Sequence, residues 1–207
     1  ILTIIFTQRK KNINKNISIE NINENLINII NLLNSKIENK KEYIKKKTIK
    51  YKNNLFIIKF NGDIQAKETE KLRELVSFIT LISKEDDEVL LILNSNGGLV
   101  NNYGLAATQL ERIKKKNIKL TISIDLVAAS GGYLMAIVGN QIIASKFAII
   151  GSIGVIGQIP NFNKLLTKCS IEMEQHTSGQ YKKNLTIFGK NTENDRIKFK
   201  EILERTH

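Results

Sequence analysis

The chain of 207 residues has very few of the residue types that build metal clusters and disulfide frameworks. Cys169 is its one cysteine, so an intrachain disulfide and a zinc site of the cysteine type are both excluded. It lies in a Lys-Cys-Ser segment without glycine-rich support, which makes it a poor candidate nucleophile. His176 and His207 are the two histidines, too few for a histidine-rich metal site. We therefore expect a chemistry that needs neither a metal nor an organic cofactor.

Acidic residues are outnumbered by basic ones, and the formal net charge is +12. A charge of this size would normally indicate a nucleic acid or an anionic lipid surface as a partner. The basic residues are unevenly distributed, however. Residues 1–53 hold 12 Lys or Arg and 4 Asp or Glu, a net charge of +8, which leaves +4 for the other 154 residues. The part with the chemical motifs is only mildly basic, and we expect no nucleic acid partner.

Long hydrophobic runs are also absent. Residues 1–7, ILTIIFT, are apolar but much shorter than the ~20 residues of a transmembrane helix. The basic cluster Arg9, Lys10 and Lys11 follows, which is typical of the cytoplasmic flank of an anchor and suits an anionic lipid surface. We interpret residues 1–7 as a candidate for the end of a transmembrane anchor, the alternative being a frayed apolar terminus without a membrane role. Residues 8–53, which include apolar residues at helical spacing, are predicted to form a basic helical or flexible linker.

A domain of alternating strands and helices is predicted over residues 54–207, and we expect it to be incomplete at its C-terminal end. Short apolar runs predict strands at 55–60, 89–93, 120–124 and 141–144. Amphipathic runs predict helices at 67–83 and 101–115. This alternation implies crossover connections and a largely parallel sheet, so the predicted fold class is α/β. The strands are nearly continuous apolar runs, as expected of parallel strands buried on both faces.

The segment Asn96-Gly97-Gly98 follows a predicted strand, at the end of a parallel sheet where ligand sites form. Two glycines allow a positive φ and bring backbone N–H groups close to a substrate. An oxyanion hole needs such donors, and losing one costs ~10²–10³ in rate. Gly97 and Gly98 are therefore candidate oxyanion or substrate-binding residues, although the same sequence also occurs in ordinary turns.

Ser130 follows another predicted strand and precedes an apolar helical run. Its small neighbours Ala129 and Gly131 allow close approach of a peptide, and a following helix would direct free N–H groups at the attacked carbonyl. Two interpretations stay open from the local sequence, a nucleophile and a helix N-cap. Under the catalytic interpretation, the N–H of Gly131 is the second oxyanion donor.

Lys182 follows Ser130 by 52 residues and is the candidate base. A serine hydroxyl is a weak nucleophile at neutral pH unless a base takes its proton. A lysine can do this if burial in a cleft lowers its pKa toward ~7–8. Lys183 is the obvious competitor for this role.

Six ordered segments make the chain from residue 54 onward similar to the S49 peptidase family, the signal peptide peptidase A group, and most of all to its SohB-type inner-membrane members. They are FIIKFNGDI, NSNGG, NYGLAATQLERI, AASGGYLMA, FAIIGSIGVIGQIPNFNKLL and HTSGQYKKNLTIFG. A series of this length is far more specific than any one motif.

The resemblance implies roles for particular residues. It makes Ser130 the nucleophile and Lys182 the general base, and it makes Ser95–Gly98 the oxyanion turn, with Asn96 in place of the family's proline. It also implies a ClpP/crotonase-like fold of repeated ββα units. It further implies cleavage of peptides such as signal-peptide remnants or membrane-protein segments, a homo-oligomer, and a bacterial inner membrane location with a single N-terminal anchor.

Other interpretations compete with a serine–lysine dyad. His176, in an alternating run over 171–176 that predicts a strand, could form a triad with Glu174. Ser152, between two glycines, is a rival nucleophile. The chain could also be an inactive membrane-tethered scaffold derived from a peptidase. A crotonase-type acyl-CoA enzyme would share the fold and the glycines but would not need Lys182.

Overall fold

The computed structural model describes residues 2–6, 18–37, 52–179 and 185–207. The chain divides into two compact units, Ile1–Ile153 and Gly154–His207. The first unit contains the sheet and helices α1 to α4, and the second contains α5 and α6.

The sheet of the first unit is largely parallel and has the strand order β2-β1-β3-β4-β5-β6. Strands β1, β3, β4, β5 and β6 pair in parallel, β2 pairs with β1 antiparallel, and β7 pairs in parallel with the end of β5. This topology confirms the predicted α/β class. The strands are β1 (Leu2–Phe6), β2 (Ile19–Asn21), β3 (Asn54–Gly62), β4 (Glu88–Ser95), β5 (Lys119–Ala129), β6 (Gln141–Ala144) and β7 (Ile149–Gly151).

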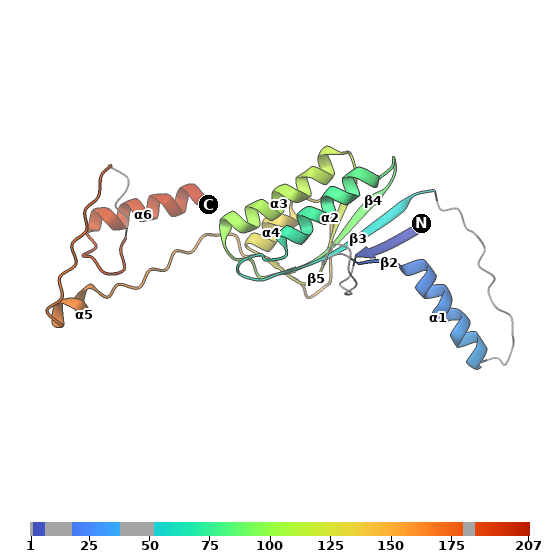
Figure 1. Ribbon diagram of the computed structural model, residues 1–207, viewed down its shortest axis with the longest axis horizontal. Coiled ribbons are helices and arrows are strands. Elements are labelled where there is room, and N and C mark those ends of the chain that lie inside the picture. The colour runs from blue at the N-terminus through green and yellow to red at the C-terminus, as the bar shows by residue number, and fades with distance from the viewer. Residues whose placement is uncertain (1, 7–17, 38–51, 180–184) are drawn as a thin grey trace. The chain divides into compact units, whose positions relative to one another are not determined.

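Helices α2 (Thr69–Ile82), α3 (Val100–Lys115) and α4 (Gly131–Ala136) lie over one face of strands β3 to β5, and α1 (Ile22–Ile37) precedes them (Figure 1). Their apolar residues and alternate residues of the strands make one core. In β4, Leu91 and Leu93 are fully buried, whereas Leu90 and Ile92 are partly exposed. The prediction that these strands are buried on both faces was therefore wrong for β4, because the described helices of this unit cover one face.

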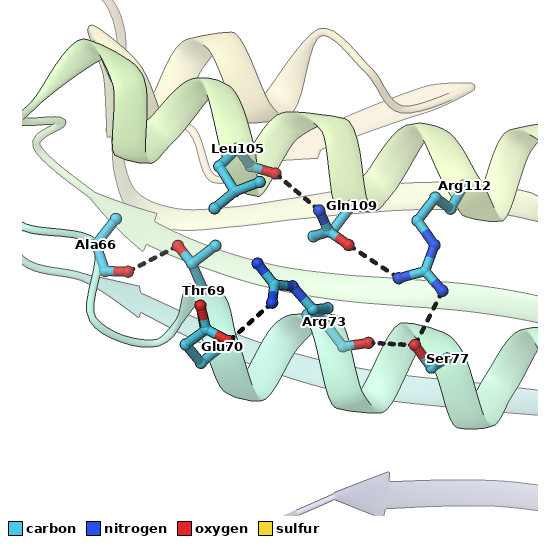
Figure 2. Close-up of polar contacts among 8 residues, drawn as sticks. All are labelled: Ala66, Thr69, Glu70, Arg73, Ser77, Leu105, Gln109 and Arg112. Carbon is cyan, nitrogen blue, oxygen red and sulfur yellow. Dashed lines mark hydrogen bonds and ion pairs between the residues drawn. The ribbon is translucent and has the colours of Figure 1, made fainter.

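A polar bridge joins α2 to α3 above the sheet (Figure 2). The guanidinium of Arg112 donates to the Ser77 hydroxyl at 2.9 Å and to the Gln109 side-chain oxygen at 2.9 Å. At the start of α2, the Thr69 hydroxyl donates to the carbonyl of Ala66 at 2.7 Å. The Arg112 bonds join α2 to α3, and the Thr69 bond ties the start of α2 to the loop that leads into it from β3.

The structure describes only part of the N-terminal region for which an anchor and a linker are predicted. Residues 2–6 form β1, paired with β2 and β3, and residues 22–37 form α1. No helix among the residues that the structure describes is long and apolar enough to cross a membrane. Most of the linker, residues 8–17 and 38–51, lies outside the described residues, and the anchor stays a prediction.

The second unit is largely irregular around α5 (Asn163–Lys168) and α6 (Glu193–Thr206). A capping box begins α6, in which the Thr192 N–H donates to the Asp195 carboxylate at 2.9 Å and the Asp195 N–H donates to the Thr192 hydroxyl at 3.3 Å. The strand predicted at 171–176 was wrong, since these residues form no strand and all six are exposed. An alternating pattern makes a strand only where its apolar face is buried.

Candidate active site

The candidate site lies at the carboxyl ends of β3, β4 and β5. Gly62 pairs with Ser95, and Ser95 pairs with Ala128 after a register shift between Leu93 and Ser95, so the three strands end side by side. The loop after β4 contains Gly97 and Gly98, and the turn after β5 contains Ser130. The sheet thus brings together two of the three segments that the sequence singled out.

Ser130 occupies a strained turn between β5 and α4. Its backbone has φ 50° and ψ −118°, its N–H donates to the carbonyl of Gly151 at 2.8 Å, and its carbonyl accepts from the N–H of Leu134 at 2.9 Å. A residue other than glycine held in such a sparsely populated region costs about 1–3 kcal/mol and points to a functional constraint. A sharp, strained strand-to-helix turn is also the way in which α/β hydrolases present a nucleophilic serine.

The Ser130 side chain is partly exposed and does not cap α4. Its hydroxyl makes no hydrogen bond to any residue in the described parts of the chain. Ser130 has the N-cap position without the N-cap bond, so the capping interpretation does not account for the serine.

Gly97 brings the two turns into direct contact. Its φ is +85°, and a Cβ at this position would lie 2.7 Å from both the Ala129 carbonyl oxygen and the Gly131 nitrogen, and 2.8 Å from the Ser130 Cβ. A Cβ would therefore collide with backbone that has no room to move. Glycine at this position lets the turn after β4 pack against the turn that holds Ser130.

The three candidate glycines differ in the state of their N–H groups. The N–H of buried Gly97 donates to the Ser95 hydroxyl at 3.0 Å. Gly98 is exposed and Gly131 partly exposed, and neither N–H has a partner among the described residues. Gly98 and Gly131 can therefore act as oxyanion donors, while the contacts of Gly97 are structural.

A buried chain of hydroxyl groups supports the turn after β4. The Tyr103 hydroxyl lies 2.6 Å from the Ser95 hydroxyl and donates to the carbonyl of Asp63 at 2.7 Å. Tyr103 is fully buried, and burial raises the pKa of its phenol, with the Ser95 hydrogen bond opposing this. Sequence reasoning missed this residue. The available signal was a tyrosine on the inward face of a predicted helix, whose hydroxyl needs a partner.

The structure describes some of the remaining candidates and not others. Lys182 and Lys183 lie outside the described residues. Glu174 and His176 lie 3.6 Å apart in the second unit, with side chains 84% and 91% exposed. Ser152 is exposed, one residue past the Gly151 carbonyl that holds Ser130. Within the described ranges no group of three or more histidine, cysteine or acidic residues could hold a metal.

Comparison with known proteins gives a consistent set of relatives. The model of "Peptidase family S49 N-terminal" matches residues 1–110, and that of "Peptidase family S49" matches residues 112–207. The chain is 56% identical over 156 residues to a "Probable protease SohB" of Buchnera aphidicola from Acyrthosiphon pisum, covering 75% of this chain and 46% of that protein. It is 51% identical over 153 residues to the "Probable protease SohB" of Haemophilus influenzae, covering 74% and 43%.

A "Putative protease SohB" of Buchnera aphidicola from Baizongia pistaciae is 43% identical and matches 99% of this chain and 66% of its own length. The chain spans between 43% and 66% of the length of these SohB relatives, and about half of most of them. Among solved structures, a ClpP1 mutant from Listeria monocytogenes is similar with a TM-score of 0.30 and 19% identity, over 42% of this chain and 46% of that chain.

Proposed function

Because the chain belongs to peptidase family S49, we propose that it is a serine endopeptidase with Ser130 as nucleophile and Lys182 as general base. The observation that carries the proposal is the strained turn of Ser130, whose hydroxyl does not cap the helix that it precedes. The printed name of its relatives, "Probable protease SohB", supports the same reaction class.

The proposed reaction passes through an acyl-enzyme. The Ser130 oxygen attacks the carbonyl carbon of a peptide bond while Lys182 takes the hydroxyl proton. The N–H groups of Gly98 and Gly131 donate to the resulting oxyanion. The tetrahedral intermediate expels the amine, which takes the proton from Lys182. Water, activated by Lys182, then hydrolyses the ester and restores the Ser130 hydroxyl.

Substrates and location follow from the resemblance and are part of the proposal. We propose peptides such as signal-peptide remnants or membrane-protein segments as substrates. An N-terminal anchor would hold the protein at the bacterial inner membrane, and the active form would be a homo-oligomer. The strong basic excess of residues 1–53 supports contact with an anionic lipid surface.

Single-turnover cleavage of a fluorogenic peptide by the full-length protein tests the dyad. We expect Ser130→Ala and Lys182→Ala each to lower the rate by at least ~10³-fold, because members of a catalytic unit act together. Lys183→Ala, the matched control, should cleave at the parent's rate. A parent that neither cleaves nor reacts with a serine-directed probe would favour the inactive scaffold. An active Lys182→Ala variant would mean that another group is the base.

A further inference from the structure

Tyr103 contacts both segments that hold the proposed oxyanion donors. Through its hydroxyl it bonds to Ser95, the first residue of the turn that ends at Gly98. Its ring lies against Gly131, since a Cβ at Gly131 would meet the ring at Cγ and would lie 2.8 Å from Cδ2. The side chain comes from α3 and is fully buried, so its position is fixed by the core.

The hydroxyl groups form a chain with one direction. The Tyr103 hydroxyl has one proton, which it donates to the Asp63 carbonyl. The Ser95 hydroxyl must therefore donate to the Tyr103 oxygen, and the Ser95 oxygen accepts from the Gly97 N–H. Every donor in this buried chain has an acceptor, and removing one member leaves its neighbour unpaired.

The space around the two hydroxyl groups is closed. A Cβ at Gly62, the last residue of β3, would collide with the Ser95 and Tyr103 oxygens. On the outer side of the same loops, the N–H of Leu99 donates to the carbonyl of Ile64 at 2.8 Å. The turn that contains Gly98 is therefore held from inside by a hydroxyl chain and from outside by a backbone bond.

We propose that Tyr103 is a positioning residue that holds the N–H groups of Gly98 and Gly131 in the geometry of the oxyanion hole, acting through the Ser95 hydroxyl on one side and through its ring on the other. The proposal rests on the proposed function of Ser130. Tyr103 does not touch the reacting atoms. Its effect falls on the transition state, because the oxyanion exists there and in the tetrahedral intermediate but not in the bound substrate.

The test compares full-length Tyr103→Phe, which keeps the ring and removes the hydroxyl, with the parent. We expect kcat to fall ~10- to 100-fold, because an N–H group that no longer points at the oxyanion stabilises the transition state much less. KM should stay within about twofold. A peptide aldehyde supplies the second measurement. Its carbonyl carbon bonds to the Ser130 oxygen and its carbonyl oxygen becomes the oxyanion or takes the proton, so its inhibition constant should rise by the same factor as kcat falls.

Two controls separate positioning from general destabilisation. Ser77→Ala removes a hydroxyl of α2 that accepts a hydrogen bond from Arg112 of α3, away from the site (Figure 2). This variant should keep kcat within about twofold of the parent. Ser95→Ala removes the middle hydroxyl of the chain, and its kcat should fall by the factor expected for Tyr103→Phe. This variant tests the proposal by itself if Tyr103→Phe does not fold. The kcat of the double variant should be no lower than that of Ser95→Ala alone, because both substitutions break the same hydroxyl chain.

The outcomes distinguish the positioning role from the proposed function. If Ser130→Ala is inactive while Tyr103→Phe and Ser95→Ala keep the parent's kcat, the positioning role is overturned and the peptidase mechanism stands. Equal losses of kcat in Tyr103→Phe and Ser77→Ala would also overturn it, since a structural effect would then suffice. If Ser130→Ala stays active, the proposed function fails, and the positioning role fails with it.

Discussion

At the scale of single residues, Ser130 shows how a fold keeps an unfavourable backbone conformation. Its N–H and carbonyl are both bonded, to Gly151 in β7 and to Leu134 in α4. Because these partners belong to regular elements, the backbone of Ser130 is determined from both sides and its positive φ persists. Both bonds are made by backbone groups, so the hydroxyl stays without a partner among the described residues and is available to a base.

Gly97 gives the sharpest test at this scale. We expect Gly97→Ala to destabilise the protein by about 1–3 kcal/mol, because φ is +85° and the new Cβ would press on the Ala129 carbonyl and the Gly131 nitrogen. Cleavage should fall at least tenfold, since the same clash moves the Ser130 turn. Urea unfolding and single-turnover cleavage measure the two effects.

Gly104→Ala is the matched control for this change. Nothing lies within 4 Å of a Cβ at Gly104, which is in the interior of α3, so alanine should stabilise the protein by about 0.5–1 kcal/mol and leave cleavage unchanged. If the two substitutions had similar effects on cleavage, the contact between the two turns would not matter for the reaction.

At the scale of elements, the sequence predicted the central strands and helices because each has a clear period and a clear end. The apolar run at 89–93 lies within β4, which ends at Ser95 before the glycines, and the amphipathic run at 101–115 is α3 within one residue. Strand β5 is longer than the strand predicted at 120–124. Residues 127–129 extend β5 because β7 pairs with them, and a three-residue strand has too short a pattern to be read from sequence.

The site was predictable only where its chemistry is local. Ser130 and the glycines lie in short motifs next to predicted strands, so their place at one end of a parallel sheet could be inferred. The link from Tyr103 to Ser95 and Asp63 depends on how α3 packs over the ends of β3 and β4. No spacing along the chain encodes that packing.

The bridge between α2 and α3 is the element-scale feature to test (Figure 2). We expect Arg112→Ala to lower stability by about 1–3 kcal/mol, because the partly buried guanidinium bonds both Ser77 and Gln109. Arg73→Ala is the control, since Arg73 pairs with exposed Glu70 at 3.2 Å and should change stability by less than about 0.5 kcal/mol. The urea concentration at the midpoint of unfolding measures both changes in stability, provided that the m-value is unchanged. Equal losses would show that the bridge adds nothing beyond a surface ion pair.

At the scale of the whole molecule, chemistry and charge are carried by different parts of the chain. Ser130 belongs to the first unit, whereas the proposed base Lys182 lies outside the described residues. The basic excess lies elsewhere, since residues 1–53 carry +8 of the net +12. Attraction to an anionic surface should therefore depend on the N-terminal part and be separable from catalysis.

Two runs of three lysines let this separation be measured. We expect Lys45, Lys46 and Lys47, changed together to Gln, to weaken binding to vesicles that contain phosphatidylglycerol at least tenfold, because each basic residue near an anionic surface contributes about 1 kcal/mol. The same change at 114–116 removes equal charge from the mildly basic part and should weaken binding far less. Binding of the parent should fall as salt is raised. Equal weakening by both changes, or equal binding to neutral phosphatidylcholine vesicles, would mean that residues 1–53 do not direct the protein to an anionic surface.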